Sequence, residues 1–170
     1  AMMYLHQLNY IHRDLKPDNV VIDENFHPHV TGFLLMDKYE QGKKFEQNVG
    51  TILYMAPEVV SEEEYDLRAD VYSFAILMYQ VVTGLSSNQV YQDIKSVFQL
   101  FKLVSQGKRP QFNTPVKKPI QTLIEQCWSE KPSDNLTFEQ LFQKLAYDLD
   151  YYLDNADANK VKAYADFIKQ

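Results

Sequence analysis

Three polar side chains that could take part in chemistry lie close together near the start of the chain. Residues 12–20 read HRDLKPDNV and contain Asp14, Lys16 and Asn19. A carboxylate can accept a proton from a reacting group, an ammonium can offset negative charge, and an amide oxygen can bind Mg²⁺. An HRD triplet alone also fits a solvated turn, so the functional interpretation depends on the whole run.

A second run of similar specificity follows at residues 50–58, which read GTILYMAPE. Together the two runs resemble the catalytic loop and the end of the activation segment of eukaryotic-type protein kinases. The resemblance extends over roughly residues 1–150 and is to the large C-terminal lobe. Residues 104–110 and 127–129 are similar to the tyrosine-kinase-like group.

The resemblance implies a role in phosphoryl transfer for each polar side chain. Asp14 would accept or orient the attacking hydroxyl, Lys16 would lie near the transferring phosphoryl group, and Asn19 would bind Mg²⁺. Thr51 would bridge Asp14 and Lys16 through its hydroxyl group, which points to hydroxyl substrates of the Ser/Thr kind. ATP and Mg²⁺ are the cofactors that this resemblance implies.

Other residues of the family pattern would support the loop or the nucleotide. His12 belongs to the structural part of the motif, and Arg13 would bind a negative group on the activation segment. Residues 34–49 contain no Ser or Thr, so Glu46 is a candidate for that negative group. Val21 lies on a β-branched run that would contact the adenine ring from below. The alternative for Val21 is a place in the hydrophobic core.

One residue of the family pattern is missing. The Asp of the metal-binding Asp-Phe-Gly motif falls at Gly32, because Phe33 is retained and Leu34 follows it. Asp37 comes too late in the chain to replace it. The principal carboxylate for Mg²⁺ is therefore absent, and we expect weak or no binding of ATP and Mg²⁺.

Two acidic residues would hold the lobe together. The resemblance implies that Asp70, at the start of the central helix, accepts hydrogen bonds from the backbone of the catalytic loop. The alternative is an ordinary acidic residue favoured by the dipole at a helix N-terminus. Glu58 normally pairs with an Arg, but the corresponding residue here is Asn135, which leaves Glu58 without its usual partner.

The element pattern predicts a mainly α fold with a small β-hairpin. The family resemblance implies that this fold is a protein-kinase-like C-terminal lobe without the N-terminal lobe. The hairpin is expected over 20–31, with helices over 1–8, 91–105 and after Pro119, and with a capping box at Thr137. The central helix has an apolar stripe. Its members are Val71, Phe74, Met78 and Val81. We expect a partial kinase domain over 1–150 and a helical extension over 151–170.

Composition excludes some classes of function. The 170 residues carry a formal net charge of −6, which argues against nucleic-acid binding. Cys127 is the single cysteine, so a reducing, cytoplasmic location is the simplest expectation. We found no long apolar run, and we expect no metal site at the four histidines. The family's Gly-rich loop, strand Lys and helix Glu do not appear in this sequence.

Three functions agree with these features. The first is a Ser/Thr-type protein kinase that acts on protein substrates. The second is a pseudokinase that works as a scaffold or partner-binding module in signalling. The third is an incomplete product of a kinase gene. A helical scaffold unrelated to kinases would instead leave Asp14, Lys16, Asn19 and Thr51 apart in space. The sequence leaves the oligomeric state and the identity of any partner open.

Overall fold

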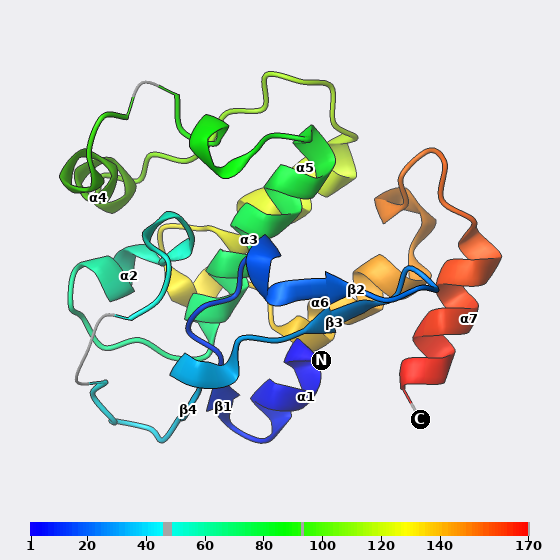
Figure 1. The fold of residues 1–170 in the computed structure, drawn as a ribbon, viewed down its shortest axis with the longest axis horizontal. Coiled ribbons are helices and arrows are strands. Elements are labelled where there is room, and N and C mark those ends of the chain that lie inside the picture. The colour runs from blue at the N-terminus through cyan, green and yellow to red at the C-terminus, as the bar shows by residue number, and fades with distance from the viewer. Residues whose placement is uncertain (46–48, 93, 170) are drawn as a thin grey trace.

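The computed structural model describes residues 1–45, 49–92 and 94–169, and it is mainly helical with two small sheets (Figure 1). The predicted class, a mainly helical fold with a small β-hairpin, is confirmed. The helices are α1 Met2–Gln7, α2 Pro57–Val60, α3 Arg68–Thr83, α4 Val97–Ser105, α5 Lys118–Cys127, α6 Phe138–Tyr147 and α7 Ala158–Ile168. The strands are β1 Tyr10–Ile11, β2 Val20–Ile22, β3 Pro28–Val30 and β4 Asp37–Lys38.

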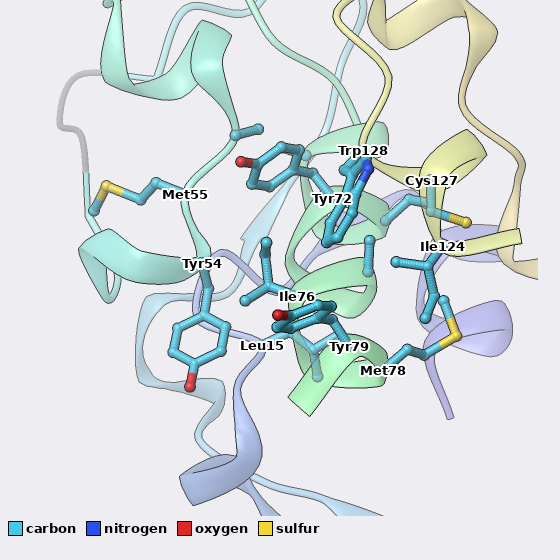
Figure 2. Packing of buried hydrophobic residues seen from close by; sticks show 14 of the residues in the cluster. Leu15, Tyr54, Met55, Tyr72, Ile76, Met78, Tyr79, Ile124, Cys127 and Trp128 are labelled. Atoms are coloured by element: carbon cyan, nitrogen blue, oxygen red, sulfur yellow. The ribbon is translucent and has the colours of Figure 1, made fainter. Parts of the chain in front are cut away.

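Helix α3 lies at the centre of the fold and carries much of the hydrophobic core (Figure 2). Tyr72, Ile76 and Tyr79 of α3 are buried, and Ile124 and Cys127 of α5 are buried with them. The helix ends at Gly84, whose φ of 69° suits a residue without a Cβ. Val81 was expected in the core stripe, but 64% of it is exposed. It lies in the last turn of α3 on the side that stays open to solvent, whereas the preceding Tyr79 and Gln80 are buried.

The predicted hairpin forms from β2 and β3, which pair in antiparallel register with Val21 opposite His29. Its turn is closed by the Asp23 carboxylate, which accepts hydrogen bonds from the backbone N–H groups of Asn25 and His27. The bond from His27 is the main reason that the pKa of Asp23 falls to about 2. Val21 is 52% exposed, so its assignment to the core is wrong.

The hairpin histidines have a carboxylate neighbour that sequence reasoning missed. Asp23 Oδ2 lies 3.5 Å from His27 Nδ1 and 3.2 Å from His29 Nε2. Within the part of the chain that the structure describes, no group of three or more His, Cys, Asp or Glu residues has a geometry able to hold a metal. These contacts therefore shape the hairpin turn.

A second sheet, which the sequence did not predict, joins β1 to β4. Tyr10 lies opposite Lys38, and Ile11 lies opposite Asp37. Each strand has only two residues, which is too short for an alternating sequence pattern to identify. Strand β1 leads directly into the catalytic loop. Its pairing with β4 therefore holds the start of the loop next to the segment that follows Phe33.

Helix α4 is shorter than predicted. It begins after Ser96, whose hydroxyl accepts a hydrogen bond from the Gln99 backbone N–H at 3.2 Å. This cap sets the start of the helix, whereas the prediction began at residue 91. Leu100 and Val104 of this helix are buried, whereas Phe98 is 78% exposed.

The last two helices pack against each other at the edge of the lobe (Figure 1). The predicted capping box of α6 is confirmed, because Thr137 accepts from the Gln140 backbone and Gln140 accepts from the Thr137 backbone. Helix α7 also reaches the hairpin, where Tyr164 stacks on His27 with ring centroids 4.2 Å apart. The boundary at residue 150 stays a prediction. Among the described helices, none has both the length and the apolar character required to cross a bilayer.

Glu58 in α2 is a buried carboxylate with only 8% of its surface exposed. None of the ion pairs among the described residues includes it. Burial raises the pKa of Glu58, while its own backbone N–H and the charge of Arg109 partly oppose the rise. Asn135 is also buried, and its Oδ1 accepts a hydrogen bond from the Ser129 backbone at 3.2 Å. Asn135 therefore has a structural contact of its own.

We expect Glu58→Gln to increase the free energy of unfolding at neutral pH by about 1–2 kcal/mol, because it removes a buried charge. Because the folded-state pKa is raised, the protonated Glu58 favours folding at acid pH, and this contribution is lost as pH rises through that pKa. The variant should therefore show a flatter dependence of stability on pH. Urea unfolding at several pH values measures both effects.

The control for this variant is Glu63→Gln, which changes an exposed carboxylate just after the same helix. It should alter the free energy of unfolding by no more than about 0.5 kcal/mol. A loss of stability in Glu58→Gln at neutral pH would mean that the ionised Glu58 has a stabilising partner.

Candidate functional site

The catalytic-loop segment rests on Asp70, whose carboxylate is buried in the core at 0% exposure. Asp70 Oδ2 accepts the backbone N–H of His12 at 2.8 Å, and Oδ1 accepts that of Arg13 at 2.9 Å. His6 of α1 donates from Nε2 to the same carboxylate at 2.9 Å. Arg13 has a φ of 65°, a left-handed conformation that costs energy for a residue with a Cβ. Charge-assisted bonds from Asp70 hold it there.

His12 joins the loop to the segment that ends at Gly32. Its ring is fully buried, and Nε2 donates to the backbone carbonyl oxygen of Thr31 at 2.8 Å. This bond leaves Nδ1 as an acceptor, and the Asp14 backbone N–H lies 3.3 Å from it. The His12 ring also meets the Phe33 ring edge-on, with centroids 5.4 Å apart. His12 thereby fixes the positions of Asp14 and Gly32 relative to each other.

The structure brings Asp14, Lys16, Asn19 and Thr51 together. The Thr51 hydroxyl donates to Asp14 Oδ1 at 2.7 Å and accepts a hydrogen bond from Lys16 Nζ. Lys16 Nζ also lies 3.1 Å from Asp14 Oδ2. Asn19 Nδ2 donates to the backbone oxygen of Asp14 at 2.7 Å and to its Oδ2 at 2.9 Å. Both carboxylate oxygens of Asp14 therefore have donors.

This arrangement keeps Asp14 ionised. Burial alone would raise the pKa of Asp14, but the hydrogen bonds from Thr51 and Lys16 and the charge of Lys16 outweigh it and lower the pKa. Asn19 adds a further hydrogen bond in the same direction. A carboxylate held in this state can orient a hydroxyl group, but it is a weak proton acceptor at neutral pH.

Gly32 has a φ of 78°, so the backbone at this position is left-handed. A Cβ placed on Gly32 would fall on the carboxamide of Asn19. The Asn19 side chain therefore occupies the space beside Gly32 into which any side chain there would have to extend. Gly32 also supplies no ligand atom of its own.

The residues present do not fit Mg²⁺ in the way the family pattern requires. Mg²⁺ prefers oxygen ligands, and carboxylates above all. At this site Gly32 has no side chain, and the Asp14 oxygens bind Thr51, Lys16 and Asn19. Among the four clustered side chains, the amide oxygen of Asn19 is the one that accepts no hydrogen bond from the other three. A single neutral oxygen is a poor ligand set for this cation.

Arg13 faces the segment that follows Gly32. Its Nε donates to the backbone oxygen of Leu35 at 2.6 Å, and its guanidinium lies 4.0 Å from Asp37 Oδ2. The guanidinium also lies over the Phe45 ring, 5.2 Å from the centroid. Asp37 is thus a neighbour of Arg13. It does not replace the metal ligand expected at position 32. Glu46, the candidate partner of Arg13, is outside the described residues.

Val21 lies on the exposed hairpin, and its contact with an adenine ring stays a prediction. Sequence reasoning missed His6, which binds Asp70 from below the loop. A signal for it existed, because His6 lies four residues after the buried Met2 and so shares that face of α1. The helical spacing did not predict that Asp70 would contact His6 on this face of α1.

Comparison with known proteins agrees with this geometry. The protein kinase domain family matches residues 1–145. A probable LIM domain-containing serine/threonine-protein kinase of Dictyostelium discoideum is 33% identical over 145 residues, covering 85% of this chain and 22% of that protein. Serine/threonine-protein kinase 12 of Arabidopsis thaliana is 34% identical over 153 residues, covering 85% and 32%.

The serine/threonine/tyrosine-protein kinase HT1 of Arabidopsis thaliana is 32% identical over 141 residues, covering 83% of this chain and 35% of that protein. The chain thus spans about a fifth to a third of the length of these three relatives. The match runs through both sequence motifs and through Asp70. This chain belongs to the protein kinase domain family.

Proposed function

We propose that this chain is a catalytically impaired domain of the Ser/Thr kinase type that acts chiefly as a pseudokinase, binding a protein partner in signalling. The observation that carries the proposal is the pair formed by Gly32 and Asn19. Gly32 offers no metal ligand, and the Asn19 carboxamide fills the space beside it. A protein substrate or signalling partner and a cytoplasmic location belong to the same proposal.

The physical argument concerns charge. Phosphoryl transfer depends on positioning and on neutralising the charge of the phosphate oxygens. Removing one preorganised electrostatic stabiliser typically slows a reaction by about 10²–10³-fold. Asp14 does not take the place of the missing carboxylate, because its two oxygens already bind Thr51, Lys16 and Asn19. We therefore expect ATP and Mg²⁺ to bind weakly and transfer to be very slow.

The alternative is an active Ser/Thr-type kinase, and one observation favours it. Lys16 and Thr51 meet at Asp14, which is the arrangement expected for orienting a substrate hydroxyl. Family members use ATP and Mg²⁺ and act on proteins. On this alternative the missing carboxylate would reduce the rate without abolishing the reaction.

Phosphate transfer separates the two proposals. We expect the chain, incubated with Mg²⁺, labelled ATP and a generic basic protein, to transfer no more γ-phosphate than the variant Asp14→Asn. Asn has the same size as Asp and keeps an oxygen that can accept a hydrogen bond from Thr51. Asp14→Asn therefore serves as the negative control for phosphate transfer. Robust transfer by the unmodified chain, lost in Asp14→Asn, would contradict the pseudokinase proposal.

A second experiment tests the metal argument directly by comparing Gly32→Asp with Gly32→Ala. Both variants place a Cβ in left-handed backbone and against Asn19, so both should lose about 1–2 kcal/mol of stability. Only Gly32→Asp adds a carboxylate. We expect its Mg²⁺-dependent affinity for ATP, measured by calorimetry, to exceed that of Gly32→Ala by about tenfold or more. Equal affinities would show that the lost carboxylate is not what limits binding.

A further inference from the structure

A pocket of about 430 Å³ lies away from the Asp14 cluster, where α1, α6, the N-terminal end of α3 and the segment after β4 meet. These four segments are far apart in the sequence. The volume falls within the range of about 300–1,000 Å³ that is typical of small-molecule sites. Nothing in the proposed kinase chemistry uses this pocket.

The walls of the pocket are largely apolar. Met3 of α1, Leu67 and Val71 at the start of α3, and Phe138 of α6 line it together with Tyr39. Val71 and Phe138 are buried, so these two walls belong to the core and are rigid. A flat apolar body can pack against these walls, and the pocket is open to solvent elsewhere.

The polar lining combines donors and acceptors. Arg68 pairs with Asp66 at 2.8 Å, and its side chain is 37% exposed. Its Nε–H is covered by protein atoms and has no acceptor among the described residues. Glu139 adds a second carboxylate to the lining. Because Asp66 already neutralises Arg68, the pocket has no net positive charge to attract an anion. Arg68 lines the pocket and carries a donor without an acceptor among the described residues, but in this conformation protein atoms cover that donor.

The pocket is connected to the catalytic loop. His6, which lines it, donates to Asp70, and Asp70 accepts the backbone N–H groups of His12 and Arg13. On the other side, the backbone N–H of Tyr39 donates to the carbonyl of Asn9 at 2.7 Å. A molecule that packs on His6 and Tyr39 would therefore stabilise both the support of the loop and the start of the following segment.

We propose that this pocket is a binding site for an uncharged small molecule that has an aromatic body and an amide-type carbonyl group. The body fills the apolar walls. The carbonyl accepts from Arg68 Nε–H after a rotation of the Arg68 side chain, and the amide N–H groups face Glu139 or Asp66. Occupancy orders the catalytic loop through His6 and Asp70. Binding in this pocket does not require a bound nucleotide, so the proposal can be tested separately from the pseudokinase proposal.

Three probes of one shape test the ligand chemistry on the unmodified chain: 2-naphthamide, 2-naphthoate and naphthalene. Binding is followed in ¹H–¹⁵N spectra by the Arg68 Nε–H signal and by the backbone signals of His12 and Arg13. We expect 2-naphthamide to bind about five- to tenfold more tightly than either of the others, as one added hydrogen bond would produce. Equal binding of naphthalene, tighter binding of 2-naphthoate, or no shift at Arg68 would overturn the proposal.

Two Trp variants on α1 locate the site. Met3→Trp places an indole in the pocket and should weaken 2-naphthamide binding at least tenfold. Tyr4→Trp adds the same group to a position that is 63% exposed, and it should leave binding unchanged. Unchanged binding by a folded Met3→Trp chain would overturn the location. The probe series on the unmodified chain decides the proposal even if Met3→Trp does not fold.

Discussion

The carboxylate of Asp70 is the constraint on which the site depends. It is a charge with no exposure to solvent, and such a charge is tolerated only where hydrogen bonds replace its hydration. Three donors, from His12, Arg13 and His6, do so here. Their convergence fixes the left-handed turn at Arg13, and that turn directs Asp14 toward Thr51. Without Asp70 the loop would have no reason to keep this geometry.

The site built on this support contains two opposing features. Asp14, Lys16, Asn19 and Thr51 bind one another through hydrogen bonds and one ion pair. Gly32 stands at the position where the family pattern has a metal-binding carboxylate. The side chains that would orient a hydroxyl group are therefore assembled, while position 32 supplies no group that could hold the cation.

The periphery of the lobe shows how charges that lack the family's partners are accommodated. Glu58 is buried, and Asn135 stands at the sequence position of its usual Arg partner. The Asn135 amide oxygen instead accepts a hydrogen bond from the Ser129 backbone. The cost of burial then appears as a raised pKa of Glu58. Helix α7, outside the family match, adds contacts of its own to the hairpin through Tyr164 and His27.

The sequence by itself determined the family, the fold class, the four clustered side chains and the loss of the metal carboxylate. These followed from the resemblance of two short runs, residues 12–20 and 50–58, to protein-kinase motifs. The capping box at Thr137 was equally local and equally predictable. The contact of Asp70 with the loop was implied only through the family resemblance.

Tertiary structure decided what depends on neighbours distant in the chain. The pairing of β1 with β4, the exposure of Val21, Val81 and Phe98, and the hydrogen bond from His6 to Asp70 are of this kind. A helical or β-branched pattern shows that one face is apolar, but it does not show which face the rest of the chain covers. The place of Asn19 beside Gly32 also needed the folded chain, because it arises from two segments meeting across the loop.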